Sequence, residues 1–142
     1  MKYYIATSLN NIQSHNELRD YLREELDWQL TYDWTTHGSV KNTSTDKLSS
    51  VAMAETKAVA EADILIVILP GGIGTHTELG MALAQLKPTF IMTNDPGHFK
   101  TGDKTCAFYY HDLVTQVVGN KDTLLSALKE KIPSLELEDI TS

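Results

Sequence analysis

The chain has 142 residues, of which 42% are hydrophobic, and its 19 acidic and 12 basic side chains give a formal net charge of −7. A chain of this length forms one compact domain and buries about 70% of its unfolded surface. The acidic balance and the lack of any Lys or Arg run argue against a nucleic-acid partner, which would require a basic patch. We therefore expect a single domain over residues 1–142.

Cysteine usage and apolar segments indicate the expected compartment. The single cysteine, Cys106, excludes an intramolecular disulfide and a cysteine-built metal site, which is typical of a reducing cytoplasm. The N-terminus has no signal-peptide core, and the longest apolar run, residues 64–69, is far shorter than the roughly 20 residues of a membrane span. The five histidines show no metal-ligand spacing. These features predict a cytoplasmic protein with no membrane partner and no metal.

The first half of the chain alternates between strand-like and helix-like segments. Leucines spaced by four, at Leu18, Leu22 and Leu26, share one face of a helix. The expected elements, in chain order, are a strand over residues 2–6, a polar loop over 7–14, a helix over 17–26, a strand over 30–34, a Ser/Thr/Asn-rich loop over 39–45 and an alanine-rich helix over 46–62.

The second half begins with a continuous Ile/Leu/Val run, which is typical of a parallel strand buried on both faces. The expected elements are a strand over residues 64–69, a helix over 77–86, a strand over 89–93, a turn over 94–97, a loop over 98–105, a segment over 109–118 that the pattern does not assign to strand or helix, a helix over 122–132 and a frayed acidic tail over 136–142. This alternation predicts a single-domain α/β fold, Rossmann- or flavodoxin-like, with a parallel sheet of about five strands flanked by helices.

The most informative segment is the glycine-rich loop after the central strand, Pro70-Gly71-Gly72-Ile73-Gly74-Thr75. Open α/β sheets bind their ligands in the loops at the carboxyl ends of the strands. Glycines let the backbone approach a substrate closely, a phosphate above all. The loop is neither a Walker motif nor a full dinucleotide fingerprint, so a tight turn without a ligand is the alternative.

Glu78 follows this loop, and we expect it at the beginning of a helix. There the macrodipole favours the ionised carboxylate by about 0.3–1 kcal/mol, which suits a nucleophile better than a general acid. The alternative is a first-turn residue that only complements the helix dipole. The loops after the first three strands should meet at one edge of the sheet and bring residues 7–8, 34–38 and 71–78 together.

Three pieces of the sequence resemble the nucleoside 2-deoxyribosyltransferase superfamily, which includes the deoxynucleoside 5′-monophosphate N-glycosidases. They are Tyr4-Ile5-Ala6-Thr7-Ser8, then Glu55 eight residues before Asp63, and Gly74-Thr75-His76-Thr77-Glu78-Leu79-Gly80-Met81-Ala82. The resemblance covers about the first two thirds of the chain. It implies that Glu78 attacks the anomeric carbon of a 2-deoxyribose and expels the base. It also implies that Glu55 holds and protonates the substrate and that Tyr4 positions the nucleophile. This chemistry resembles a retaining glycosidase and needs no cofactor.

The departures from the family pattern concern the substrate. The transferases commonly have an Asp, contacting the sugar 5′-hydroxyl, where this chain has Gly72, and its loss removes repulsion toward a 5′-phosphate. Ser8 falls where the monophosphate hydrolases place a phosphate-contacting serine, and Glu55 stands where Asp is more usual. We expect the substrate to be lined by Thr7, Ser8, His37, Gly71, Gly72, Gly74, Thr75 and His76.

Several alternatives remain open from the sequence. The glycine loop also resembles the cytokinin-activating phosphoribohydrolases, although the chain lacks their upstream arginine-bearing motif. A module that binds a nucleotide derivative without turning it over is a further alternative. The resemblance implies a homo-oligomer, for which Phe108-Tyr109-Tyr110 offers an interface, the other interpretation being core packing. The sequence does not decide between hydrolase and transferase, between nucleoside and 5′-monophosphate, or among bases.

Overall fold

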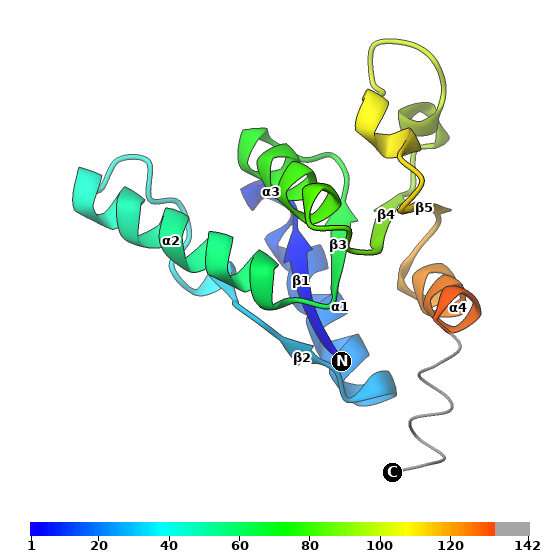
Figure 1. The fold of residues 1–142 in the computed structure, drawn as a ribbon, viewed down its shortest axis with the longest axis horizontal. Helices are drawn as coiled ribbons and strands as arrows, with labels where there is room; N and C mark the ends of the chain where they lie inside the picture. The colour runs from blue at the N-terminus through cyan, green and yellow to red at the C-terminus, as the bar shows by residue number, and fades with distance from the viewer. Residues whose placement is uncertain (133–142) are drawn as a thin grey trace.

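A five-stranded, entirely parallel sheet forms the centre of the molecule (Figure 1). The computed structural model describes residues 1–132, so the tail expected over residues 136–142 lies outside them. The strand order is β2-β1-β3-β4-β5. The strands are β1 (Lys2–Ala6), β2 (Gln29–Leu30), β3 (Ile64–Ile68), β4 (Thr89–Thr93) and β5 (Val114–Val118). The expected α/β fold with about five parallel strands is confirmed.

Two helices cover each face of the sheet, and the residues of β1 alternate between the two cores. Tyr4 and Ala6 pack with α2 (Thr45–Glu61) and α3 (Ile73–Ala84), whereas Tyr3 and Ile5 pack with α1 (Ile12–Leu26) and α4 (Lys121–Lys131). Strand β3 is buried along its whole length, as its unbroken apolar sequence predicts. Trp28 and Trp34 are both buried core residues.

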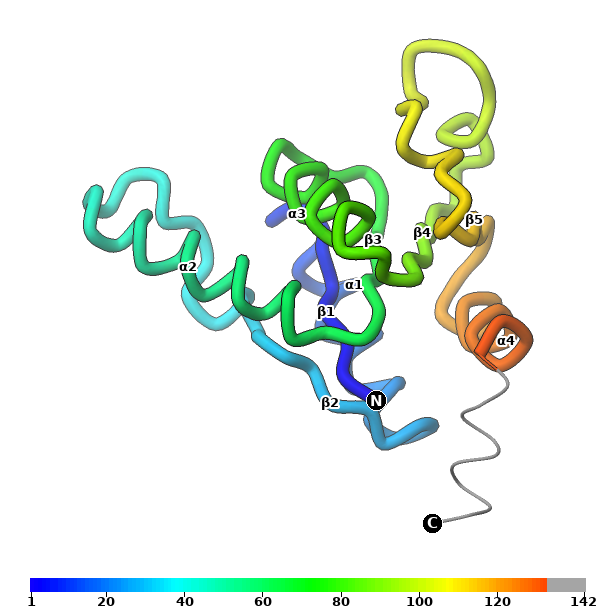
Figure 2. The backbone as a smooth tube through the Cα atoms, viewed as in Figure 1, coloured from blue at the N-terminus to red at the C-terminus, as the bar shows by residue number. Residues whose placement is uncertain are grey.

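Short 3₁₀ helices occupy the connections between these elements. They are η1 (Leu9–Asn11), η2 (Trp34–Thr36), η3 (Pro96–Phe99) and η4 (Ala107–Tyr110). Both η3 and η4 belong to the long connection between β4 and β5, which Figure 2 shows as a wide excursion of the backbone. The segment that the pattern left unassigned therefore divides between η4 and β5. The first half of α2 extends beyond the sheet (Figure 1).

The strand expected over residues 30–34 is wrong, because β2 contains only Gln29–Leu30. The side chain of Asp33 accepts a hydrogen bond from the Thr35 amide at 3.0 Å and thereby caps η2. The indole Nε1 of Trp34 donates to the carbonyl of Ile5 at 2.9 Å, inside the core. A side-chain cap and a buried indole thus turn the backbone away from the sheet, where the β-like composition alone favours a strand.

Two helices begin earlier than their sequence pattern predicts. Helix α1 starts at Ile12 rather than at residue 17, and α3 starts at Ile73 rather than at residue 77. In α3 the N-cap is Gly72, and Gly74 lies in the first turn. Glycines favour loops, but the first helical turn tolerates them because packing of the following turns stabilises the helix.

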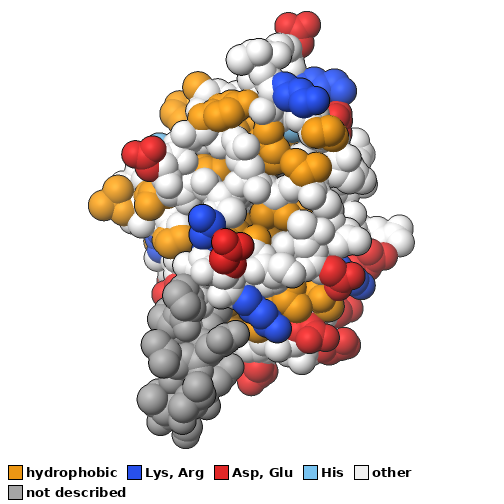
Figure 3. Space-filling model, turned by 90° about the vertical axis from the view of Figure 1, so that its right-hand side faces the viewer, with side chains coloured by type: hydrophobic (Ala, Val, Ile, Leu, Met, Phe, Trp, Pro, Cys, Tyr) orange, Lys and Arg blue, Asp and Glu red, His pale blue; other side chains and the backbone are white. Residues whose placement is uncertain are grey.

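The surface shows no concentration of positive charge on the face that carries α4 and the β4–β5 connection. Figure 3 shows Lys and Arg side chains there in small, separate groups among acidic and hydrophobic ones. Within residues 1–132, no helix has both the length and the apolar character needed to cross a membrane.

Candidate active site

Tyr4 and Glu78 are 74 positions apart in the sequence and meet inside the protein. The Oη atom of Tyr4, on β1, donates a hydrogen bond of 2.6 Å to Oε2 of Glu78, on α3. Tyr4 is fully buried and Glu78 is 7% exposed. A carboxyl group at this depth requires partners. The structure therefore brings together two of the three residues to which the resemblance assigns catalysis.

The expected environment of Glu78 is wrong in one respect. Helix α3 begins at Ile73, so Glu78 lies in the second turn rather than at the helix beginning. The macrodipole acts mainly on the first turn and does not hold this carboxylate in its ionised form. Burial instead raises the pKa of Glu78 to about 8, with the hydrogen bond from Tyr4 lowering it and the neighbouring Glu55 raising it.

Glu55 joins this pair from α2. Its carboxyl group shares a hydrogen bond with that of Glu78, and the pKa of Glu55 is also raised by burial, against the opposing effects of His37 and of the bond to Glu78. Two carboxylates in contact cannot both ionise easily, so they titrate as a coupled pair. Burial and the two carboxylates also raise the pKa of Tyr4, which keeps its proton and remains a donor.

His37 and Tyr32 form the outer side of the carboxylate pair. His37 lowers the pKa of Glu55, whereas burial and then Glu55 raise the pKa of Tyr32, and the two rings lie 5.9 Å apart. Nδ1 of His37 lies 2.8 Å from the carbonyl of Gly38, which can only accept, so Nδ1 carries the proton. Nε2 of His37 is buried and has no hydrogen-bond partner among residues 1–132. The sequence predicted His37 at the site but not Tyr32, which falls in the wrongly expected strand.

The glycines of the loop differ in what they accommodate. A Cβ on Gly71 would lie 2.7 Å from Cβ of Thr75, so the packing of the loop against α3 requires glycine there. A Cβ on Gly72 or Gly74 would meet no atom within 4 Å, and Gly72, with φ of −100°, needs no glycine conformation. At these two positions the missing side chain leaves open space beside the α3 N-terminus.

Gly72 is held by the residues that follow it. Its amide donates to Oγ1 of Thr75 at 3.1 Å, and its carbonyl accepts from the backbone amide of His76 at 3.2 Å. Nδ1 of His76 lies 2.8 Å from the same carbonyl, while Nε2 lies 2.7 Å from Oη of Tyr109. Both ring nitrogens of His76 are therefore engaged inside the protein, and Tyr109 is a residue that sequence reasoning did not connect with this loop.

The first loop is tied to the glycine loop through Asn11. Oγ1 of Thr7 donates to the carbonyl of Ile68 at 2.7 Å. Nδ2 of Asn11 donates to Oγ1 of Thr7 at 3.0 Å and to the carbonyl of Pro70 at 2.9 Å. The hydroxyl of Ser8, by contrast, makes none of the hydrogen bonds found in residues 1–132 and is half-buried. Thr7 thus joins two strand ends, while Ser8 is left available for a ligand.

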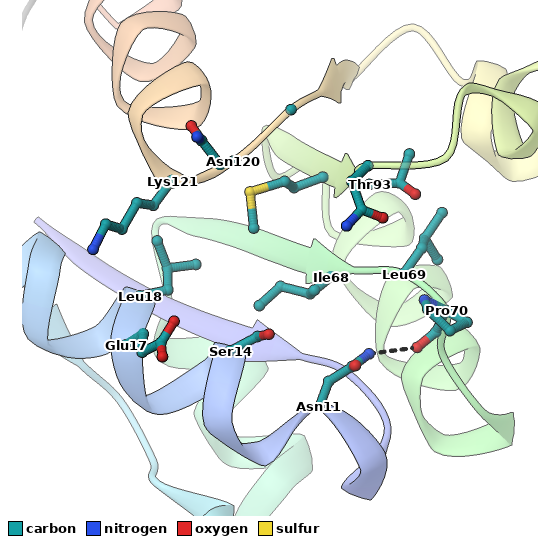
Figure 4. Close-up of a pocket in the computed structure, with 13 residues that line it drawn as sticks. Asn11, Ser14, Glu17, Leu18, Ile68, Leu69, Pro70, Thr93, Asn120 and Lys121 are labelled. Atoms are coloured by element: carbon teal, nitrogen blue, oxygen red, sulfur yellow. Dashed lines mark hydrogen bonds between the residues drawn. The ribbon is translucent and has the colours of Figure 1, made fainter.

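A separate groove of about 560 Å³ lies on the other face of the sheet, between α1 and α4 (Figure 4). It contains neither Glu55 nor Glu78. The Asn11–Pro70 hydrogen bond lies at its edge (Figure 4). The groove is lined by Asn11, Ser14, Glu17, Leu18, Ile68, Leu69, Pro70, Met92, Thr93, Asn94, Gly119, Asn120 and Lys121.

Within the described part of the chain, the two carboxyl groups of Glu55 and Glu78 do not form part of a metal-binding cluster. Among residues 1–132, no three His, Cys, Asp or Glu side chains are arranged to hold one. Cys106 is half-buried and free.

Solved structures of three named enzymes share this fold. A CMP N-glycosidase from Clostridium botulinum matches with a TM-score of 0.58 and 17% identity, over 91% of this chain and 99% of that chain. A 2-deoxyribosyltransferase from Bacillus psychrosaccharolyticus gives 0.63 and 18%, over 87% and 90% of the two chains. A 2-deoxyribosyltransferase from Leishmania mexicana gives 0.62 and 15%, over 91% and 97%. The fold implied by the sequence resemblance is confirmed.

Comparison of the sequence itself with models of known families and with curated proteins finds no match.

Proposed function

We propose that this protein cleaves or transfers the N-glycosidic bond of a 2′-deoxynucleoside or its 5′-monophosphate, with Glu78 as the nucleophile. The observation that carries the proposal is the group formed by buried Tyr4 and Glu78 with half-buried Glu55, close to an open glycine loop. Three proteins with the same fold are named for N-glycosidic chemistry, which supports this bond type.

We propose that Glu55 and Glu78 hold one proton between them near neutral pH, which suits this chemistry. A retaining glycosidase needs one ionised carboxylate as nucleophile and one protonated carboxyl as acid. In our proposal the substrate-bound pair keeps its single proton on Glu55, and Glu78 is ionised and accepts the hydrogen bond from Tyr4. The carboxyl groups of retaining enzymes are about 5 Å apart, whereas a hydrogen-bonded pair is closer. An entering sugar therefore separates Glu55 from Glu78 and breaks their bond.

The proposed reaction proceeds in two displacements. A carboxylate oxygen of Glu78 forms a bond to C1′ of the sugar, while the C1′–N bond breaks and its electron pair leaves with the base. The departing nitrogen takes the proton of Glu55. Water or a second base then attacks C1′ of the covalent deoxyribosyl–Glu78 intermediate, returns its proton to Glu55 and releases Glu78. Retention of configuration at C1′ follows.

The glycine loop is proposed to hold the 5′ end of the substrate. The first amides of a helix have no intrahelical acceptor, and a Ser, Thr or Asp at the N-cap would occupy them with its own side chain. Gly72 has no such side chain, so the amides of the first turn are left for an external acceptor such as a phosphate. The free hydroxyl of Ser8 supports the same assignment. A 5′-monophosphate is the substrate form that this end favours.

The test compares wild-type protein with Glu78→Gln, which keeps the shape of the side chain and removes the nucleophile. Deoxynucleosides, deoxynucleoside 5′-monophosphates and ribonucleoside 5′-monophosphates are each incubated with the protein, and free base is quantified by chromatography. We expect Glu78→Gln to lose at least a thousandfold in rate and Glu61→Gln, at the exposed end of α2, to retain full activity. Mass spectrometry should find a deoxyribosyl adduct on Glu78.

Full activity in Glu78→Gln would overturn the mechanism, and no free base from any substrate would overturn the proposed function. Base release from ribonucleotides alone would favour the phosphoribohydrolase alternative.

A nucleotide-binding module without turnover is the second candidate. The observation that favours it is the raised pKa of Glu78, because a protonated carboxyl is not a nucleophile and donates a hydrogen bond instead. Calorimetry distinguishes the two candidates. Tight binding of a nucleotide that is recovered intact supports the module, and progressive release of base supports the enzyme.

A second copy of the chain is the proposed partner at the open side of the site. Ile73, beside the glycine loop, is 90% exposed, and Met53 on α2 is exposed as well. We propose that these exposed apolar side chains belong to a patch that the second copy covers, since a contiguous apolar patch is typical of an interface. The aromatic cluster divides, with Tyr109 in the core and Phe108 and Tyr110 on the surface. Light scattering at working concentration should give at least a dimer, and a monomer would contradict the proposal.

A further inference from the structure

Tyr109 contacts the residues of the glycine loop from a later part of the chain. It belongs to η4, in the long connection between β4 and β5, and is only 3% exposed. Its carbonyl accepts a hydrogen bond from Nε2 of Gln116 at 3.0 Å, and its ring packs edge-on against Phe99 with centroids 6.1 Å apart. A side chain fixed at this depth holds its hydroxyl in one place. That hydroxyl lies 2.7 Å from Nε2 of His76.

The hydrogen bonds define the tautomer of the neutral His76 ring. The carbonyl of Gly72 can only accept, so Nδ1 of His76 donates to it at 2.8 Å. In the neutral ring Nε2 is then an acceptor, and the hydroxyl of Tyr109 is its donor. A directed chain therefore runs from Tyr109 through His76 to the carbonyl of Gly72.

We propose that Tyr109 is a positioning residue that acts through His76 to fix Gly72 and the amides of the first turn of α3 for the 5′ end of the substrate. Gly71 and Gly72 form a flexible pair, because glycine loses more conformational freedom on ordering than any other residue. Gly72 has no side chain with which to cap its own helix. Its amide donates to Oγ1 of Thr75 and its carbonyl accepts from His76, so these bonds hold Gly72 without occupying the first-turn amides as a capping side chain would.

This inference rests on the proposed function, because its kinetic consequence concerns the substrate of that reaction. A change at Tyr109 should have a different kinetic effect from a change in the proposed catalytic group. A looser glycine loop weakens binding of the 5′ end and leaves the carboxylate pair unchanged. The loss therefore falls on KM for the 5′-monophosphate rather than on kcat, and a nucleoside without the phosphate is little affected.

The test uses Tyr109→Phe, which removes one oxygen and keeps the packed ring. Tyr110→Phe is the matched control, because Tyr110 is 50% exposed and its hydroxyl makes none of the hydrogen bonds found in residues 1–132. We expect Tyr109→Phe to raise KM for the deoxynucleoside 5′-monophosphate about five- to tenfold, the effect of one hydrogen bond. We expect kcat and the KM for the nucleoside to change less than about twofold.

Two further measurements test whether Tyr109 acts through His76. His76→Ala should reproduce the rise in KM, and the double variant should be no worse than His76→Ala alone, since both residues act along one route. Nitrogen-15 NMR of the histidine rings should show a protonated Nδ1 and a hydrogen-bonded, unprotonated Nε2 for His76, and the Nε2 signal should shift in Tyr109→Phe but not in Tyr110→Phe.

An unchanged Nε2 signal, or equal losses for nucleoside and monophosphate, would overturn the positioning role. A wild-type protein that releases no base would instead overturn the proposed function, and the NMR comparison would still decide whether Tyr109 holds His76.

Discussion

The two ends of the candidate site are built by different physical means. At one end, Tyr4, Glu55 and Glu78 converge from β1, α2 and α3 in a buried place where removal from water changes the proton affinity of the carboxyl groups. At the other end, Gly72 and Gly74 leave the α3 N-terminus open, and the polar groups there are backbone amides. The first end therefore determines the ionisation of the carboxyl groups, and the second end determines the space and the hydrogen-bond donors available to a ligand.

This difference teaches where each kind of substitution should act. Changes at the carboxylate end alter ionisation, so they should appear in kcat and in pH profiles. Changes at the glycine end alter space and charge around a ligand, so they should appear in KM and in substrate preference. Three predictions test this division. The two kinetic ones come first, in order of decreasing effect, and the third concerns stability.

Tyr4→Phe should have the largest effect. The hydrogen bond from Tyr4 lowers the pKa of Glu78, so its loss raises that pKa further and leaves less ionised nucleophile at neutral pH. A hydrogen bond to a charged group contributes about 1.5–3 kcal/mol, which corresponds to a ten- to hundredfold fall in kcat at pH 7. The acidic limb of the pH–rate profile should move to higher pH.

Tyr3→Phe is the control for this variant, because Tyr3 packs on the opposite face of β1 against Trp28. If Tyr4→Phe and Tyr3→Phe have the same pH–rate profile, the assignment of Tyr4 to the nucleophile is wrong.

Gly72→Asp should act on the other end. The new carboxylate has room and an allowed backbone conformation, and it repels a phosphate while it accepts the first-turn amides itself. KM for the 5′-monophosphate should rise about tenfold or more, with little change for the nucleoside. Tm should rise slightly, since replacing glycine at a compatible position stabilises by about 0.4–1 kcal/mol.

Gly72→Asn separates charge from capping, because it caps the helix without a charge and should raise KM less than Gly72→Asp does. Equal effects on nucleoside and monophosphate would show that the loop does not contact the 5′ end.

The pH dependence of stability concerns the carboxylate end alone, and it is measured in Tm rather than in kinetics. The pKa of Glu78 is about 8 in the folded protein against an ordinary value of 4.5, so the folded state binds more protons than the unfolded state between these values. The free energy of unfolding therefore decreases as pH rises through this window, and this contribution is fully lost above pH 8. Thermal unfolding of Glu78→Gln should show a flatter dependence of Tm on pH than wild type.

Each unit of pKa shift corresponds to about 1.4 kcal/mol, or a few degrees in Tm for a domain of this size. Parallel Tm curves for wild type and Glu78→Gln between pH 5 and 8 would contradict the raised pKa.

The sequence predicted the elements that have a simple periodicity. Strands β1 and β4 lie at the expected positions, β3 ends one residue earlier than expected, and α2 is displaced by one residue at each end. These segments are predictable because burial on both faces or an alanine-rich helix leaves a local signature. The beginnings of α1 and α3 were missed, because their first turns contain polar residues or glycine, which are equally typical of loops.

The sequence predicted which residues form the candidate site better than it predicted their contacts and ionisation. The resemblance named Tyr4, Glu55 and Glu78, and the structure brings them together. It did not connect Tyr109 with His76, because their contact joins segments 33 positions apart through a connection that has no regular pattern. Each contact of this kind depends on where two separate elements pack.

The sequence by itself determined the alternation of strands and helices up to β4, the glycine loop and the placement of a carboxylate after it, since these follow from local composition and spacing. Only the tertiary structure decided the state of that carboxylate. The sequence placed Glu78 at a helix beginning, where the dipole favours ionisation, whereas folding buries it in the second turn beside Glu55 and Tyr4. Desolvation and a like-charged neighbour depend on all the atoms around a group, and no local pattern contains that information.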